Sequence, residues 1–178
     1  MKIAGLVFTR PTYHGVGCSS ETLTAAIDLA HTYDVPVIID EAHGSHLHLL
    51  PHTSQTPSFM NGLSCGADIV VQSSHKTLSS LSQTAMLHLH PTAFSFLQKY
   101  GDEGNNLPLV ERTIQSFFSM LTTTSPNALL LASLDATRAQ MEDEGATAII
   151  NAVDSIAALK KECKEGCFVN QLLLSLNP

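Results

Sequence analysis

Two short polar segments follow apolar runs that are typical of buried strands. The segment VIIDEAHGSH (37–46) places Asp40 at the end of the first run. The segment VVQSSHKTLSS (70–80) places Lys76 after a cluster of hydroxyl groups and a histidine. The chain has only nine Lys and Arg among its 178 residues, so a lysine directly after an apolar strand needs an explanation. Two such endings in one chain indicate a site.

A lysine and an aspartate that share one cleft could hold a carbonyl cofactor. A partly desolvated lysine has a lowered pKa and becomes a nucleophile toward carbonyls. A buried aspartate can keep a proton on a heteroaromatic nitrogen, and pyridoxal phosphate needs both groups. Hydroxyls of Ser73, Ser74 and Thr77 could bind its phosphate. Taken alone, Lys76 also fits a surface loop, and Asp40 also fits a helix cap or a turn.

The elements before these segments predict a parallel sheet. IAGLVFTRPTY (3–13) is typical of a strand that ends in a Pro-terminated loop. Residues 19–34 are typical of an amphipathic helix with Ser19 or Ser20 as its N-cap. VPVIID (35–40) predicts a strand that is covered on both faces. Strand, helix and strand form a βαβ unit, and ligands of such sheets bind beyond the carboxyl ends of the strands.

The rest of the chain predicts one more parallel strand, an antiparallel strand and then helices. GADIVVQSS (66–74) has the pattern of a buried strand. TAMLHLH (84–90) follows too soon for a helical crossover, so it is expected to run antiparallel. Helices are predicted over 91–100, 107–121 and about 126–162, with a break near Gly145. There are no internal repeats.

Composition narrows the class of protein. The chain is 44% hydrophobic and 14% charged, which is typical of a globular protein. Its net charge of −7 argues against nucleic acid or an anionic membrane as a partner. No apolar run approaches the roughly 18 residues that span a bilayer. The four cysteines are irregularly spaced, so we expect reduced thiols and a cytoplasmic location, or an organellar one if an N-terminal leader is missing.

Four segments resemble, in order, the major domain of the bacterial-type Orn/Lys/Arg decarboxylases. They are PTYHGVGCS, VPVIIDEAHGSH, GADIVVQSSHKTLSSLSQTAMLHL and TTTSPNALLLASLDATRAQM, within about residues 3–145. The resemblance implies the aspartate-aminotransferase-like fold (fold type I), here a partial three-layer α/β/α sandwich with a mostly parallel sheet. It also implies a partial cofactor-binding domain at 1–145, and a helical extension at 146–178 that leads toward a smaller domain.

The resemblance assigns roles to particular residues. Lys76 resembles the lysine that bonds to the cofactor, and Asp40 resembles the partner of the pyridine nitrogen. Ala42 would lie against one face of the ring. The remaining expectations are His43 and His75 beside the ring hydroxyl or the substrate carboxylate, Ser73 at the phosphate, Thr12 and Tyr13 along the cleft, and Thr124 and Ser125 near the phosphate of a partner subunit.

The implied activity is decarboxylation of lysine, arginine or ornithine to the amine and CO₂, in a homodimer or higher oligomer. Family members are several times longer than this chain. They carry a phosphate loop upstream and a small domain downstream, and neither is found in this sequence. We therefore expect a partial chain, for which a non-catalytic role as a dimerisation partner of a full-length homologue is an alternative.

Two other interpretations fit short parts of this sequence. DEAH also occurs in helicases, but these need a G-x-x-x-x-G-K-[ST] motif that this sequence lacks. The segment HGSHLHLLPH places His43, His46, His48 and His52 close together, so a metal site is an alternative to a polar loop beside the cofactor. Arg112 and Arg138 lie on predicted helices and are expected on solvated faces or in ion pairs between subunits, not as substrate clamps.

Overall fold

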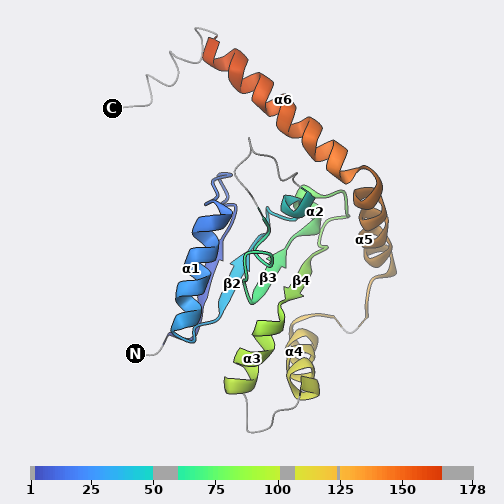
Figure 1. Ribbon diagram of the computed structural model, residues 1–178. Helices are drawn as coiled ribbons and strands as arrows, with labels where there is room; N and C mark the ends of the chain where they lie inside the picture. The colour runs from blue at the N-terminus through green and yellow to red at the C-terminus, as the bar shows by residue number, and fades with distance from the viewer. Residues whose placement is uncertain (1–2, 50–59, 101–106, 124, 166–178) are drawn as a thin grey trace.

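The computed structural model of the chain describes residues 3–49, 60–100, 107–123 and 125–165. A sheet of four strands lies at its centre (Figure 1), in the order β1 (Leu6–Thr9), β2 (Val37–Asp40), β3 (Ile69–Gln72) and β4 (Met86–Leu89). The first three strands are parallel, and β4 pairs antiparallel with β3. The expected α/β class, the mostly parallel sheet and the antiparallel 84–90 strand are therefore confirmed.

Helix α1 (Ser20–Thr32) packs against one face of the sheet. Its N-cap is Ser19, whose hydroxyl accepts a hydrogen bond from the Thr22 amide at 3.2 Å. Leu23, Ile27 and Ala30 recur at helical spacing and are buried. These helix residues form the hydrophobic core together with buried residues of the strands and loops, namely Val35, Val37, Ile39, Cys65, Ala67 and Val70.

The two faces of the sheet differ in burial. Val37 and Ile39 are completely buried on the α1 side, whereas Ile38 between them is only half-buried. Strand alternation and register place Val7 and Val71 on the face of Ile38, and they are 66% and 36% exposed. The sequence predicts that the 35–40 strand is covered on both faces. Among the described residues, only the face that packs against α1 is covered.

Helices follow β4 along the rest of the described chain. They are α3 (Pro91–Tyr100), α4 (Leu107–Leu121), α5 (Ala128–Gln140) and α6 (Ala146–Glu165). The predicted break near Gly145 is a π-helical turn, Met141–Gly145, between α5 and α6. A Cβ on Gly145 would lie 3.1 Å from Sδ of Met141 and 3.2 Å from Cδ1 of Leu49, so only glycine fits without a shift.

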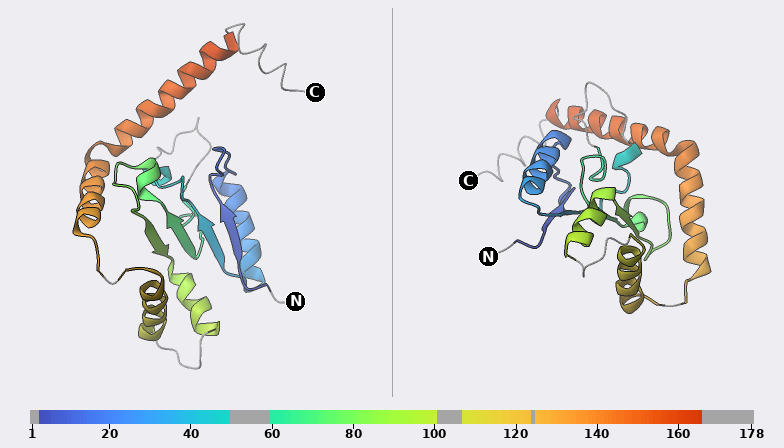
Figure 2. Two further views of the ribbon diagram at one scale, coloured as in Figure 1. Left: turned by 180° about the vertical axis from the view of Figure 1, so that it is seen from behind. Right: turned by 60° about the horizontal axis from the view of Figure 1, so that its bottom comes forward.

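Helix α6 projects away from the sheet on the side of the strands' carboxyl ends, and the two further views agree (Figure 2). None of the described helices combines the length and the apolar character that a membrane span requires. A one-turn helix, α2 (Ser74–Thr77), directly follows β3, and a 3₁₀ turn (Leu47–Leu49) follows β2. Neither short helix was predicted, because one turn is too short to show a periodic pattern.

Candidate functional site

The carboxyl ends of the three parallel strands are level with one another. Thr9 pairs with Asp40, and Asp40 pairs with Val71. The pairing continues past the strands, since the Arg10 amide donates to the Asp40 carbonyl at 2.9 Å and the Glu41 amide donates to the Val71 carbonyl at 2.8 Å. The loops after β1, β2 and β3 therefore begin at one edge of the sheet.

A cavity of about 430 Å³ lies among these loops. It is lined by Thr12 and Tyr13 after β1, by His43 and His46 after β2, and by Thr77 of α2. The rings of Tyr13 and His43 meet edge to face, with centroids 5.6 Å apart and planes at 90°. The structure thus brings the predicted cleft residues Thr12, Tyr13 and His43 together.

Asp40 and Ala42 lie at the start of the loop after β2, and both are half-buried. Asp40 Oδ1 accepts a hydrogen bond from the Ala42 amide at 2.9 Å, which closes a tight turn. This contact fixes the carboxylate and the small side chain of Ala42 relative to each other. Asp40 thus behaves as a turn residue, and it also stands at the sheet edge where the sequence predicts a ligand.

Lys76 lies on the turn of α2, and its side chain is exposed. Ser73 precedes this helix and is half-buried, but its side chain makes no capping hydrogen bond. His75 is half-buried, and its Nδ1 donates to the Thr84 carbonyl at 2.8 Å. A carbonyl can only accept, so this contact fixes Nδ1 as protonated and anchors α2 to the segment before β4.

Several predicted site residues do not line the cavity of about 430 Å³. They are Asp40, Ala42, Ser73, His75 and Lys76. These residues stand at the same sheet edge, at the ends of the adjacent strands β2 and β3. Ser125 is exposed between α4 and α5, and Thr124 lies outside the described residues.

A buried polar network beside Asp40 was not predicted from the sequence. Glu41 is completely buried; its Oε1 accepts from the Gly62 amide at 2.6 Å, and its Oε2 accepts from Gln72 Nε2 at 2.9 Å. Arg10, only 2% exposed, places Nη1 3.9 Å from Glu41 Oε1. Burial raises the pKa of Glu41, and the Gln72, Gly62 and Arg10 contacts partly offset that rise. One signal was visible in the sequence, namely Gln72 in an otherwise apolar strand.

Arg10 ties this network to distant parts of the chain. Its Nε donates to the Cys18 carbonyl at 3.0 Å, and its Nη1 donates to the Met60 carbonyl at 2.6 Å. Gly44, the last residue of DEAHG, packs so tightly that a Cβ there would lie 3.0 Å from Cβ of Glu41. Glu41 and Gly44 therefore shape the loop that carries Ala42 and His43.

The partly buried His88 on β4 should make the stability of the protein depend on pH. Burial lowers the pKa of His88, whose Nε2 lies 3.0 Å from Gln72 Oε1, and the charge of His48 lowers it further. The folded state therefore resists protonation, so stability present above about pH 6.5 is lost as the pH falls. We expect His88→Gln to flatten this loss in urea unfolding series at different pH values.

His14 provides the control for this prediction. It is exposed in the loop after β1, and it contacts the Tyr13 ring. His14→Gln should change the free energy of unfolding by less than about 0.5 kcal/mol. Burial and the His48 charge also lower the pKa of His46, so part of the slope should persist in His88→Gln. Equal slopes in the wild type and His88→Gln would contradict the assignment.

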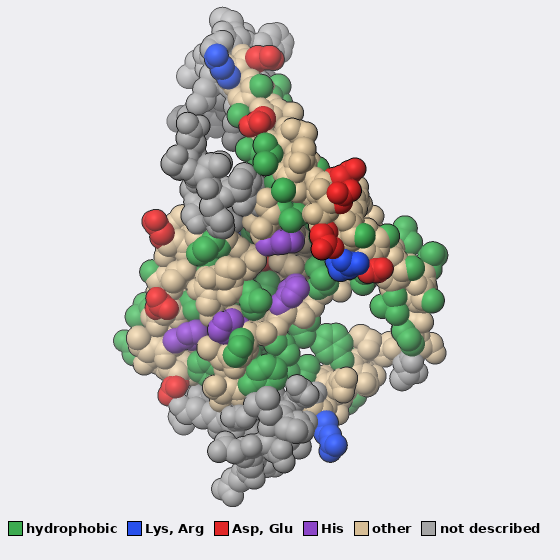
Figure 3. All heavy atoms as spheres, turned by 45° about the vertical axis from the view of Figure 1, so that its right-hand side comes forward, with side chains coloured by type: hydrophobic (Ala, Val, Ile, Leu, Met, Phe, Trp, Pro, Cys, Tyr) green, Lys and Arg blue, Asp and Glu red, His purple; other side chains and the backbone are tan. Residues whose placement is uncertain are grey.

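Histidine side chains gather on the face of the molecule seen in Figure 3. Within the described ranges, no group of three His, Cys, Asp or Glu side chains is placed to hold a metal ion. His52, the fourth member of the predicted histidine group, lies outside those ranges. Arg138 is exposed, as expected of a solvated helix face, and it pairs within its own chain with Asp135 at 3.0 Å and with Glu142 at 2.8 Å.

Comparison with known proteins places this chain in a family. Residues 2–174 match the family model of the Orn/Lys/Arg decarboxylase major domain. An arginine decarboxylase of Bacillus subtilis (strain 168) is 38% identical over 141 residues, which cover 79% of this chain and 24% of that protein. An arginine decarboxylase of Bacillus cereus is 36% identical over 153 residues, which cover 86% of this chain and 28% of that protein.

A third relative, the arginine decarboxylase of Halalkalibacterium halodurans, is 34% identical over 171 residues. The match covers 89% of this chain and 30% of that protein, so this chain spans less than a third of each of these three relatives. The family model covers nearly the whole chain, including the DEAHG and SSHKT segments. The chain therefore belongs to the Orn/Lys/Arg decarboxylase major-domain family.

Proposed function

We propose that this chain contributes the lysine and aspartate of a pyridoxal-phosphate site that decarboxylates a basic amino acid. The observation that carries the proposal is the strand register, in which Thr9 pairs with Asp40 and Asp40 pairs with Val71. Because of this register, the DEAHG and SSHKT segments begin next to each other, at the ends of adjacent strands. In a parallel sheet, this edge is where ligands bind. The arginine decarboxylase names of the relatives favour arginine as the substrate.

The polar groups at this edge fit a hydrogen-bonding cofactor. Four side-chain atoms in the segments after β2 and β3 are buried without a hydrogen-bond partner among the described residues: Ser45 Oγ, His46 Nδ1, Ser74 Oγ and Thr77 Oγ1. Buried polar atoms are nearly always paired in folded proteins, so such a group indicates a missing polar partner. His46 and Thr77 also line the cavity of about 430 Å³. The donor set therefore agrees with a phosphate or hydroxyl ligand.

Each residue has a separate role in this proposal. When bound, pyridoxal phosphate supplies an electron sink for the pair left at Cα as CO₂ departs. Asp40, held by the Ala42 amide, would keep a proton on the pyridine nitrogen. The exposed Lys76 would attach the cofactor and return a proton to Cα. His43 and His75 would flank the ring or the substrate carboxylate, and Ala42 would leave room for the ring.

The remaining features of a complete enzyme are also part of the proposal. Residues 1–145 would form part of the cofactor-binding domain, and 146–178 would lead toward a small domain. Ser73 and Thr12 would approach the cofactor within one subunit, and Thr124 and Ser125 would do so from a partner subunit in a homodimer. We place this activity in the cytoplasm.

Covalent labelling tests the proposal. Pyridoxal phosphate added to the chain and then reduced with borohydride should fix one pyridoxyl group on Lys76, as read by peptide mass mapping. We expect Lys76 to be labelled because it lies at the proposed site, and not simply because its side chain is exposed. Lys161 on α6 is also exposed and is the matched control.

The Lys76→Ala variant should take up no label above the level of Lys161, and Asp40→Asn should weaken retention of the cofactor before reduction. Label spread evenly over exposed lysines, in a chain that circular dichroism shows to be folded, would contradict the proposal. Release of agmatine, cadaverine or putrescine from arginine, lysine or ornithine would then identify the substrate.

A further inference from the structure

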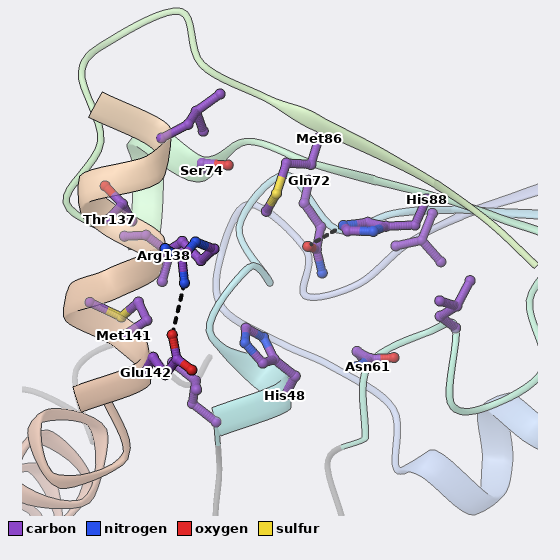
Figure 4. A pocket seen from close by; sticks show the side chains of 15 residues that line it. His48, Asn61, Gln72, Ser74, Met86, His88, Thr137, Arg138, Met141 and Glu142 are labelled. Atoms are coloured by element: carbon purple, nitrogen blue, oxygen red, sulfur yellow. Dashed lines mark hydrogen bonds and ion pairs between the residues drawn. The ribbon is translucent and has the colours of Figure 1, made fainter. Parts of the chain in front are cut away.

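A second cavity lies between α2 and α5 (Figure 4). It measures about 640 Å³ and sits between β3, β4 and the α5 helix. It is larger than the cavity of about 430 Å³, and its size falls within the range of small-molecule sites. It shares no lining residue with the cavity of about 430 Å³, so the two cavities are distinct.

The walls of this cavity are mainly apolar. Its apolar side chains come from strand, loop and helix alike: Leu63, Val70, Leu78, Met86, Leu134 and Met141. Methionine side chains adapt to ligands of different shape, and Met86 and Met141 enter from β4 and from the π turn. The walls therefore favour an apolar body of adaptable outline.

One polar atom in the wall is buried and has no partner. Ser74 is completely buried, and among the described residues nothing hydrogen-bonds its Oγ. In Figure 4 this hydroxyl points from α2 toward the side of the cavity where Met86 lies. A buried hydroxyl without a partner is costly, so a ligand group that pairs with it gains affinity. Ser74 thus marks the place of one hydrogen-bonding head group.

The charges around the cavity select a neutral ligand. Arg138 and Glu142 both line it, but they pair with each other at 2.8 Å and are mostly exposed. His88 is held by Gln72 through Nε2 at 3.0 Å, and burial favours its neutral form. Among the described residues that line the cavity, the formal charges of Arg138 and Glu142 are already paired, so an ionised ligand would lose its hydration without a free opposite charge to receive it. The cavity is thus poorly suited to a charged amino acid.

We propose that this cavity binds a small neutral molecule with an apolar body and one hydroxyl group, held by Ser74. Since Ser74 stands two residues before Lys76 on the same turn of helix, such a ligand would contact the helix that also carries Lys76. The proposal rests on the cavity and on Ser74, and it does not depend on the decarboxylase activity.

Ligand binding can be tested with three probes of one shape. Calorimetric titration should show that 4-ethylphenol binds the full chain about fivefold more tightly than ethylbenzene, because one hydrogen bond is added. 4-Ethylbenzoate, which is charged, should bind more weakly than either. The Ser74→Ala variant should remove the preference for the phenol over ethylbenzene. Equal binding of all three probes, or binding of none, would overturn the proposal.

Substitutions on α5 and the NMR signals of methionine methyl groups can test where the ligand binds. Leu134→Trp should fill the cavity and abolish ligand binding. Leu131 also lies on α5 but is 55% exposed and does not line the cavity, so Leu131→Trp should leave ligand binding unchanged. With ¹³C-methyl methionine, 4-ethylphenol should shift Met86 and Met141 but not Met120, which is 69% exposed on α4. This measurement needs no variant, so it decides the matter even if Leu134→Trp fails to fold. Shifts confined to Met120 would place the ligand elsewhere.

Discussion

Glu41→Ala is expected to lower the free energy of unfolding by about 3–5 kcal/mol, because it removes a buried carboxylate that contacts Arg10, Gly62 and Gln72. Arg10 is only 2% exposed and would lose the carboxylate 3.9 Å from its Nη1. The Gly62 amide and the Gln72 amide group would each lose an acceptor. Urea unfolding followed by circular dichroism measures the loss. Glu21→Ala, on the exposed first turn of α1, should cost no more than about 1 kcal/mol.

Glu41→Gln separates the charge from the hydrogen bonds. It keeps an oxygen for the Gly62 amide, so it should be milder than Glu41→Ala. Burial raises the pKa of Glu41 above its usual value of 4.5, so the folded state holds this proton more tightly than the unfolded state does. The associated stability is complete below about pH 4.5 and is lost as the pH rises through the raised pKa. Parallel pH profiles for the wild type and Glu41→Gln would show that Glu41 does not titrate as described.

Asp68→Ala is expected to cost about 3 kcal/mol, because a buried carboxylate that joins three elements is removed. Asp68 is completely buried. Its Oδ2 accepts from the Val37 amide at 2.7 Å and lies 2.9 Å from His31 Nε2, while its Oδ1 accepts from the Thr92 hydroxyl. It therefore ties the start of β2 to the last turn of α1 and to the first turn of α3.

Amide hydrogen exchange distinguishes this mechanism from a general loss of stability. In Asp68→Ala the Val37 amide loses its acceptor, so its exchange should accelerate more than that of the Ile39 amide in the same strand. Asp68→Asn keeps one oxygen and should be less destabilising than Asp68→Ala. Asp28→Ala on the exposed face of α1 is the control and should change stability by less than about 0.5 kcal/mol. Uniform acceleration along β2 would contradict the specific role of Asp68.

Local patterns predicted most of the secondary structure. The helix after Ser19, the strand that ends at Asp40, the antiparallel strand at 84–90 and the break near Gly145 all follow from spacing, capping and crossover length. Each of these signals involves residues that are close in sequence. The strands themselves proved shorter than predicted, with β1 limited to Leu6–Thr9, because pairing with a neighbour decides where a strand ends.

For the candidate site, too, the sequence predicted some features and missed others. The sequence by itself determined that Asp40 and Lys76 follow strands, and the resemblance of their motifs indicated the family. It did not show that Glu41, the next residue after Asp40, is the buried one. Successive residues of an extended chain point to opposite sides, and nothing local tells which side faces the core.

Tertiary structure decided that question. Glu41 is buried because Arg10, Gly62 and Gln72 surround it, and these residues lie 31, 21 and 31 positions away along the chain. The same packing leaves Lys76 exposed on α2 and encloses Ser74, two residues earlier on the same turn. A charge acquires its role from the partners that reach it, and partners this distant in sequence meet only when the sheet has formed.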